Sequence, residues 1–289
     1  MDANLQAKYR ILTGRLGALG RILVAFSGGV DSTFVLKAAV DACGPGALAV
    51  TAVSPAVPAR EQEEAVALAA FLQARHRLLP TAEMDDPNYV ANPANRCYFC
   101  KRELHARLAR LAAAEGYAAV VDGVNRDDLH DWRPGRQAAA ERGVVSPLVE
   151  ADFTKAEIRA ASHALGLPTW DKPAMPCLAS RFPYGTPITV EGLRRVEQAE
   201  AILREHGFRE LRVRHFGEAA RIEVAPAELP RLLEPNRRAA VAAALRAVGY
   251  RTVAVDPEGF RSGKLNAHLL AVAGGAAARA EGGAAEPRE

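Results

Sequence analysis

The stretch Ser27–Ser32, with the sequence Ser-Gly-Gly-Val-Asp-Ser, constrains the fold of this chain more than any other. It follows the apolar run 22–26, which is typical of a buried parallel strand, and precedes residues 33–40, which have helical composition. A Gly-Gly turn between a strand and a helix lets the backbone approach an anion, and the first amides of the helix are unpaired donors. The sequence therefore predicts a phosphate-binding loop.

The residues of this loop narrow its chemistry. Ser27 and Ser32 supply hydroxyl donors, and Asp31 suits a phosphate site if a cation such as Mg²⁺ accompanies the anion. The loop lacks the lysine of a Walker A motif and the Gly-x-Gly-x-x-Gly of a dinucleotide fold. It resembles the PP-loop of the ATP pyrophosphatases, which cleave ATP between the α- and β-phosphates and transfer AMP to a substrate oxygen. An ordinary glycine-rich turn is the alternative interpretation.

Composition sets the broad class of protein. With 289 residues, of which 49% are hydrophobic and 25% charged, the chain is long enough for one large domain or two smaller ones. No window approaches about 20 apolar residues, and the N-terminus lacks the apolar core of a signal peptide. We therefore expect a cytoplasmic protein without a membrane partner. A net charge of +3 is too small for a broad nucleic-acid-binding face.

Strand and helix patterns alternate through residue 170. Strands are expected at 47–53, 76–80, 118–121 and 144–148, and helices at 60–73, 96–115 and 154–165. This order predicts an α/β fold with a doubly wound, Rossmann-like parallel sheet in residues 1–180. Ser27, Ser54 and Gly123 follow three of the strands, so we expect them to converge at the carboxyl edge of the sheet as a nucleotide site.

A smaller domain is expected after residue 180, where the composition changes. Helices at 190–207 and 235–248 and strands at 211–214, 220–224 and 252–255 indicate an α+β domain over residues 181–273. Residues 274–289 are rich in Ala, Gly and Glu without a core pattern, and we expect this tail to be disordered.

The four cysteines favour metal binding or catalysis over disulfides in a cytosolic protein. Cys97 and Cys100 are separated by two residues, Cys177 lies near the domain junction, and Cys43 fits a small core residue on an apolar helix face. A closed zinc site needs four ligands, and no second such pair is visible. Three thiolates suit a [4Fe–4S] cluster with one open iron, although a redox pair at Cys97 and Cys100 is an alternative.

Further motifs occur in a fixed order after the loop. They are Asp122-Gly123, Asp131-Trp132-Arg133-Pro134-Gly135, the segment 176–185, Val213-Arg214 and Gly259-Phe260-Arg261-Ser262-Gly263. Together with the loop they resemble the LarE family, the sulfur-inserting enzymes of nickel-pincer nucleotide assembly, over residues 10–270. The stretch Ser180-Arg181-Phe182-Pro183-Tyr184-Gly185 is the most distinctive part of this resemblance.

The resemblance implies an ATP-dependent sulfur transferase. Such an enzyme adenylates the carboxylates of pyridinium-3,5-biscarboxylic acid mononucleotide, releases pyrophosphate and AMP, and forms thiocarboxylates. In one mode the cysteine matching Cys177 gives up its sulfur and becomes dehydroalanine. In the other mode, cysteines matching Cys97, Cys100 and Cys177 hold a [4Fe–4S] cluster that carries sulfide. This chain has all three cysteines and therefore resembles the cluster type.

The resemblance also implies roles for individual residues. Besides the three cysteines, the residues expected in catalysis are Asp31, Arg181 and Glu200. Those expected at ATP are Ser27, Gly28, Gly29, Asp31, Ser32, Ser54 and Gly123. Those expected at the mononucleotide are Ser180, Arg181, Arg212, Arg214 and Arg261. Metal positions are implied for Asp31 (Mg²⁺), Glu200 and Glu223, whereas a further acidic position of the family falls near Arg231, with Glu228 as the nearest acid.

Charge alone gives part of this assignment. Arg212 and Arg214 alternate along one strand and so share a face, where they could bind the phosphate of the nucleotide. A solvated edge strand is the alternative. Glu200 and Glu223 could likewise be ordinary surface glutamates.

Three other functions compete with this interpretation. A PP-loop tRNA thiolase with a three-cysteine cluster would need a basic track for RNA, which the balanced charge argues against. An amidating synthetase would need an ammonia source, and a nucleotide-sensing module would leave the cysteines unexplained. We expect a small nucleotide substrate, a sulfide donor and further copies of the chain as partners.

Overall fold

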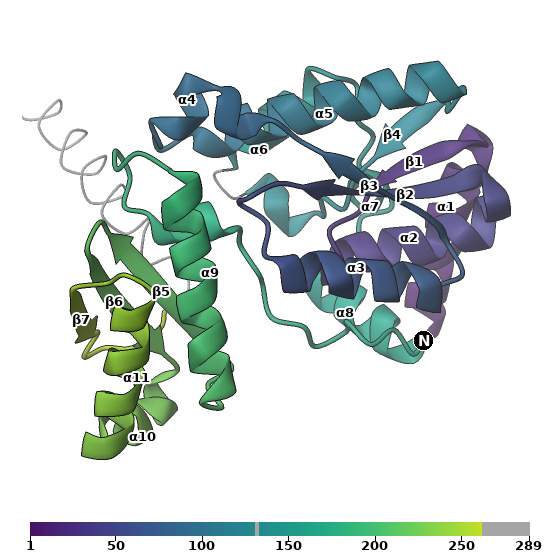
Figure 1. The fold of residues 1–289 in the computed structure, drawn as a ribbon. Coiled ribbons are helices and arrows are strands. Elements are labelled where there is room, and N and C mark those ends of the chain that lie inside the picture. Colours follow the sequence, from purple (N-terminus) through teal and green to yellow (C-terminus); the bar gives the residue numbers. More distant parts are fainter. Residues whose placement is uncertain (131–132, 262–289) are drawn as a thin grey trace, which may run out of the picture. The chain divides into compact units, whose positions relative to one another are not determined.

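The computed structural model describes residues 1–130 and 133–261, which divide into two compact units (Figure 1). Unit 1 comprises residues 1–177 and unit 2 begins at Leu178, close to the predicted boundary after Ser180. The predicted tail 274–289 and the motif residues Asp131, Trp132, Ser262 and Gly263 lie outside the described residues.

Unit 1 alternates helices and strands. Its helices are α1 (Ala3–Leu19), α2 (Val30–Cys43), α3 (Ala59–Phe71), α4 (Pro87–Val90), α5 (Arg96–Glu115), α6 (Pro134–Ala140), α7 (Pro147–Glu150) and α8 (Lys155–Ala164). Its strands are β1 (Ile22–Ala25), β2 (Ala47–Val53), β3 (Arg75–Pro80) and β4 (Ala119–Val121). The sheet is parallel with the order β3-β2-β1-β4, so the predicted doubly wound α/β fold is confirmed.

The central strand β1 explains the two layers of helices. Its side chains alternate, so that Ile22 and Val24 enter one apolar core and Leu23 enters another. Residues of α1, α2, α3 and α8 form the first core with β1, whereas residues of α5 form the second. Figure 1 shows α1, α2, α3 and α8 on one face of the sheet and α5 with α6 on the other. Because β1 is covered on both faces, it reads as a continuous apolar run.

Two segments differ from what the sequence predicts. The strand expected at 144–148 is reduced to a single parallel bridge between Val121 and Val145. Pro147 has no backbone N–H for a ladder and instead begins the helix α7. Residues 84–95, between the expected strand at 76–80 and the expected helix at 96–115, contain the short helix α4, whose N-cap Asp86 accepts a hydrogen bond from the backbone N–H of Asn88.

Unit 2 has its own core and a mixed sheet. Its helices are α9 (Val190–Glu205), α10 (Leu229–Leu233) and α11 (Pro235–Ala247), and its strands are β5 (Leu211–Phe216), β6 (Ala219–Val224) and β7 (Thr252–Val255). The sheet order is β5-β6-β7, with β5 antiparallel and β7 parallel to β6. Apolar side chains of α9 and α11 pack with those of the sheet, which makes this unit the predicted α+β type. Within the described residues, no helix is long and apolar enough to cross a membrane.

Candidate functional site

The predicted phosphate-binding loop lies between the carboxyl end of β1 and the start of α2 (Figure 1). Gly28 has a φ of +69°, and a Cβ built there would lie 3.4 Å from Ala65 of α3, so the turn requires glycine. Gly29 is the N-cap of α2 and has no side-chain capping bond, which leaves the first helix amides available. The hydroxyls of Ser27 and Ser32 are 3.1 Å apart. The loop thus presents donors at the positive end of a helix, which suits a phosphate.

The segment after β4 lies directly against this loop. A Cβ built on Gly123 would be only 2.9 Å from the backbone nitrogen of Ser32 and 3.2 Å from Cβ of Asp31. The structure therefore brings Gly123 together with the loop, as expected for the carboxyl ends of neighbouring parallel strands. Ser54 follows β2 and is buried, and its Oγ accepts a hydrogen bond from the backbone N–H of Ala56 at 3.2 Å.

Substituting Gly123 tests this close approach. We expect Gly123→Ala to push the loop out of position and to weaken pyrophosphate binding at least ~10-fold, because the clash is with backbone that cannot rotate away. Isothermal titration calorimetry with pyrophosphate measures the change. Gly14→Ala is the control, since a Cβ at this site in α1 meets nothing within 4 Å. Equal affinity for the wild type and Gly123→Ala would contradict the assignment.

Asp31 is held by two side chains from distant parts of unit 1. Lys155, the first residue of α8, places Nζ 2.5 Å from Oδ2 of Asp31, and Asn125 donates from Nδ2 to Oδ1 at 3.3 Å. Asp127 accepts the backbone N–H of Lys155 at 2.8 Å. Asp31 is therefore oriented before any metal binds, and a carboxylate oxygen is the ligand that Mg²⁺ prefers.

Lys172 fixes the turn of the loop itself. Its Nζ donates to the carbonyl oxygen of Gly28 at 3.0 Å and pairs with Glu64 of α3 at 2.9 Å. Burial alone would raise the pKa of Glu64, but the bonds from Lys172 and Arg60 hold it below its ordinary value. Lys172 thus ties the loop to α3 through a carboxylate that remains charged at neutral pH.

The three predicted cysteines are connected through their effects on thiol pKa values. Cys97 and Cys100 lie one helical turn apart in α5, and Cys177 is the last residue of unit 1. Cys97 is solvent-accessible, yet the surrounding protein withdraws its thiol from bulk water; this desolvation raises its pKa, and a charge on Cys177 raises it further. Burial raises the pKa of Cys100 strongly, and Glu83 and Cys177 add to the effect. Cys177 therefore lies within electrostatic reach of both Cys97 and Cys100.

Two buried polar groups lie beside these thiols. Tyr89 is 1% exposed and Glu83 is 3% exposed, and among the described residues neither Tyr89 Oη nor Glu83 Oε2 has a hydrogen-bond partner. Burial raises the pKa of the Tyr89 phenol, and charges on Cys177 and Cys100 raise it further. Unpaired buried polar groups are costly, so these atoms suit a polar ligand at the thiol site.

Among the described residues, no group of three His, Cys, Asp or Glu side chains is arranged to hold a metal ion. Thiolates are nevertheless the ligands that an iron–sulfur cluster takes. Cys97 and Cys100 lie at the start of the same helix, and a charge on Cys177 raises the pKa of both. The cluster stays a prediction.

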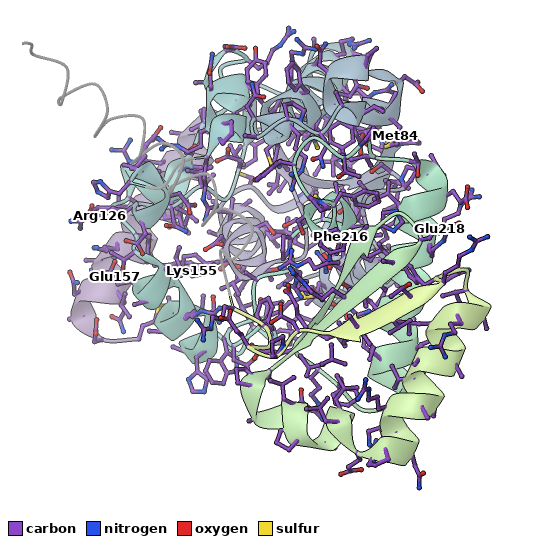
Figure 2. All side chains as sticks on the ribbon, turned by 90° about the vertical axis from the view of Figure 1, so that its left-hand side faces the viewer. Met84, Arg126, Lys155, Glu157, Phe216 and Glu218 are labelled. Atoms are coloured by element: carbon purple, nitrogen blue, oxygen red, sulfur yellow. The ribbon has the colours of Figure 1, made fainter. Side chains whose placement is uncertain are left out.

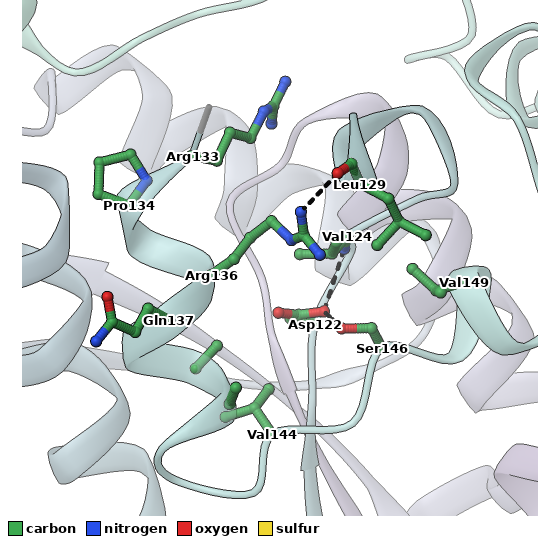
Figure 3. A pocket seen from close by; sticks show the side chains of 12 residues that line it. Asp122, Val124, Leu129, Arg133, Pro134, Arg136, Gln137, Val144, Ser146 and Val149 are labelled. Atoms are coloured by element: carbon green, nitrogen blue, oxygen red, sulfur yellow. Dashed lines mark hydrogen bonds between the residues drawn. The ribbon is translucent and has the colours of Figure 1, made fainter. Parts of the chain in front are cut away.

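A pocket of about 570 Å³ lies on the other side of the segment that follows β4 (Figure 3). Buried Asp122 accepts hydrogen bonds from Ser146 Oγ at 2.8 Å and from the Val124 N–H at 3.1 Å. Burial outweighs these bonds and raises the pKa of Asp122. Figure 3 shows Arg136 reaching from α6 to the Leu129 carbonyl, whereas Arg133 points away from Asp122 and pairs with Asp128. Arg133 of the predicted motif and Arg136 of α6 thus line this pocket, and both are bound in part by protein groups.

Unit 2 contains a buried arginine–glutamate network. Arg181 donates from Nε and Nη2 to the two oxygens of Glu200 at 2.8 and 2.9 Å, and both side chains are 1% exposed. Arg214 donates to Glu223 at 2.7 and 2.9 Å and to the carbonyl oxygen of Ser180 at 2.9 Å. The predicted residues of this region therefore form one cluster, and both glutamates hold arginines. Metal binding by Glu200 and Glu223 stays a prediction.

Arg212 donates from Nη1 to the Leu211 carbonyl oxygen at 2.6 Å. Its guanidinium lies 4.9 Å from the ring centroid of Phe260. Burial, followed by the charge of Arg181, lowers its pKa to about 10. Burial alone would raise the pKa of Glu200, but the ion pair with Arg181 holds it below the ordinary value. The surplus of positive charge at Arg212 suits an anion such as phosphate.

The remaining predicted positions lie at the surface. Arg231, which stands where the family has an acid, pairs with Glu228 at 2.9 Å and donates to the Gly207 carbonyl oxygen at 3.0 Å. It thereby fastens the end of α9 to α10. Arg261 is exposed at the end of the described residues.

Comparison with known proteins adds evidence that is independent of this geometry. No family model matches the chain. An uncharacterized protein of Synechocystis sp. is 51% identical over 262 residues, which cover 91% of this chain and 98% of that protein. The pyridinium-3,5-bisthiocarboxylic acid mononucleotide synthase of Lactiplantibacillus plantarum is 40% identical over 265 residues, which cover 91% of this chain and 95% of the synthase. The chain belongs to the LarE family.

The relationship extends through both units, because the synthase is matched over almost its full length. A more distant relative, an uncharacterized protein of Methanocaldococcus jannaschii, is 26% identical over 84% of this chain and 91% of its own length. The predicted resemblance to the LarE family is confirmed, and membership of a synthase family makes the chain an enzyme.

Several residues of this LarE-family site were missed from the sequence. Lys155, Asn125 and Lys172 reach the loop from positions 94 or more residues away, and nothing in their local sequence signals this. Glu83 and Tyr89 precede the cysteine pair in the chain, and no sequence motif marks either of them.

Proposed function

We propose that the protein is an ATP-dependent sulfur transferase that converts the carboxylates of pyridinium-3,5-biscarboxylic acid mononucleotide into thiocarboxylates. The observation that carries the proposal is the uncapped start of α2 behind Gly28 and Gly29, with Asp31 oriented beside it. The L. plantarum relative is named as a synthase of the bisthiocarboxylic acid mononucleotide, and this name suggests the substrate class.

The first half-reaction activates a carboxylate. A carboxylate oxygen of the substrate attacks the α-phosphorus of ATP, and the bond from that phosphorus to the bridging oxygen breaks. The electron pair leaves with pyrophosphate, and no proton is transferred. The amides of α2 and the hydroxyls of Ser27 and Ser32 bind the departing negative charge. Asp31 is the residue that would hold Mg²⁺, which neutralises phosphate charge when bound.

The second half-reaction replaces oxygen by sulfur. A sulfide nucleophile attacks the carbonyl carbon of the acyl-adenylate, the bond to the AMP oxygen breaks, and the sulfide proton passes to solvent. The sulfur stays at the sulfide oxidation level, so no oxidant or reductant is consumed. Cys97, Cys100 and Cys177 are the residues that would hold a [4Fe–4S] cluster, which when bound supplies sulfide at that level.

Substrate recognition is assigned to unit 2. Arg212, with Arg214 and Ser180 beside it, would bind the phosphate of the mononucleotide, because positive charge there exceeds what Glu200 and Glu223 neutralise. Arg181 orients Glu200, so its part in catalysis is to maintain this cluster.

Product analysis tests the proposed function. With the mononucleotide, ATP and Mg²⁺, we expect one AMP and one pyrophosphate for each carboxylate converted, quantified by liquid chromatography and mass spectrometry. Asp31→Asn should slow AMP formation at least ~10-fold, since it weakens a metal contact worth a few kcal/mol. Asp41→Asn is the control, because Asp41 lies on the same helix but pairs with Lys37. Release of ADP and inorganic phosphate would refute the proposal.

A further inference from the structure

Lys155 is a cation at the phosphate-binding loop that no motif assigns. Its Nζ lies 2.5 Å from Oδ2 of Asp31, which is in the first turn of α2 directly after the loop glycines. An ammonium has three donors, and among the described residues Asp31 is the one group that Nζ contacts. The side chain is 37% exposed, so it retains donors that face solvent at the loop.

Lys172 provides the contrast. Its side chain is 17% exposed, and its ammonium is bound both by the Gly28 carbonyl oxygen and by Glu64, so its donors are committed to the protein. Lys155 therefore has the greater freedom to change partners, although both lysines approach the same loop.

The backbone of Lys155 is fixed while its side chain is free to move. Thr154 and Glu157 form a capping box at the start of α8, and Asp127 accepts the backbone N–H of Lys155. Asn125 accepts the Asp127 N–H at 2.9 Å and donates to Asp31, so the two ends of the ion pair share one support. Figure 2 shows Arg126, Lys155 and Glu157 on the same side of unit 1.

The chemistry of the loop calls for such a cation. A Walker A loop carries its own lysine for the β- and γ-phosphates, and this loop has none. Asp31 also brings a negative charge to an anion site, where the ammonium neutralises it. When Asp31 binds a metal instead, the ammonium loses its partner beside the phosphates.

We propose that Lys155 is the phosphate-binding cation of this loop, held by Asp31 in the nucleotide-free protein and transferred to the pyrophosphate oxygens when nucleotide and metal bind. The role of the bound pyrophosphate as leaving group rests on the proposed function. The positive charge then stabilises the electron pair that leaves with pyrophosphate, and no proton moves.

This exchange predicts effects of opposite sign in Lys155→Gln. Without nucleotide, Mn²⁺ should bind at Asp31 about 3- to 10-fold more tightly, because no ammonium competes for the carboxylate. Pyrophosphate should bind about 10- to 100-fold more weakly, and AMP formation should fall by a similar factor, because a charge-assisted contact is lost. Lys155→Arg should recover most of the pyrophosphate affinity.

The measurements are electron paramagnetic resonance titration with Mn²⁺ alone, calorimetry with pyrophosphate, and AMP formation. Lys37→Gln is the matched control, because Lys37 forms a similar ion pair with Asp41 at 2.6 Å on α2 but lies away from the loop turn. It should behave as the wild type in all three measurements.

The outcomes distinguish phosphate binding by Lys155 from a purely structural role of this residue. If Lys155→Gln weakens Mn²⁺ and pyrophosphate binding together, Lys155 only supports the loop and the inference is wrong. Unchanged pyrophosphate affinity also overturns it. If the wild type binds pyrophosphate through Lys155 but forms no AMP from ATP, the inference stands and the proposed adenylation fails.

Discussion

Replacing Cys97, Cys100 or Cys177 singly by alanine is expected to remove the iron and the acid-labile sulfide from anaerobically reconstituted protein. Two thiolates rarely retain four irons, so each single loss should be as severe as the loss of all three. Iron and sulfide content, together with the broad visible absorbance of the cluster, measure the effect. The mutual electrostatics of the three thiols support a single shared site.

Cys43→Ala is the matched control for these variants. Cys43 ends α2, its thiol donates to the Leu16 carbonyl oxygen at 3.4 Å, and burial raises its pKa. These contacts describe a small core side chain away from the thiol site. Its substitution should leave the iron content unchanged.

Turnover separates the cluster from a sacrificial cysteine. With sulfide supplied, the wild type should make more than one thiocarboxylate per protein, and its intact mass should be unaltered afterwards. If Cys177 is itself the sulfur donor, turnover stops at one, Cys97→Ala and Cys100→Ala remain active, and the protein loses about 34 Da as dehydroalanine forms. A dehydroalanine at Cys177 after one reaction would overturn the cluster proposal.

Local sequence was sufficient to predict the loop and its fold. A strand, a Gly-Gly turn and a helix start are adjacent in the chain, and a glycine readily adopts the positive φ of Gly28. The alternation of strands and helices likewise predicted the parallel sheet of unit 1. The strand expected at 144–148 was wrong. Its apolar residues are typical of a strand, but Pro147 has no backbone N–H for strand pairing and begins a helix instead.

Contacts between residues far apart in the sequence could not be predicted from local patterns. Lys155 could be recognised as the residue after an N-cap, but its ion pair with Asp31 depends on how α8 packs beside α2. In unit 2, the shared face of Arg212 and Arg214 follows from strand periodicity, whereas the difference between them does not. The structure gives Arg214 a buried carboxylate partner, Glu223, and packs Arg212 over Phe260.

Arg214→Ala is expected to destabilise the protein by about 3–5 kcal/mol, because it leaves Glu223 charged and buried without its main partner. Glu223 is fully buried, and its remaining contact, Arg221, is 3.4 Å away and itself partly exposed. Urea denaturation followed by circular dichroism measures the change in the free energy of unfolding. Arg214→Met combined with Glu223→Met removes both charges and should recover much of the loss.

Arg212→Ala should act on the substrate instead. Removing this guanidinium relieves repulsion from Arg181 and Arg214, so we expect a change in stability well below that of Arg214→Ala. Loss of one charge-assisted phosphate contact should raise the KM for the mononucleotide by about 10- to 100-fold, corresponding to about 1.5–3 kcal/mol, while the KM for ATP changes little. Steady-state kinetics with each substrate varied in turn measures both constants. Equal changes in the two KM values would contradict the assignment of Arg212 to the mononucleotide phosphate. If Arg212→Ala lowered stability as much as Arg214→Ala, the excess positive charge would be a structural feature of unit 2, and the phosphate would have to bind elsewhere.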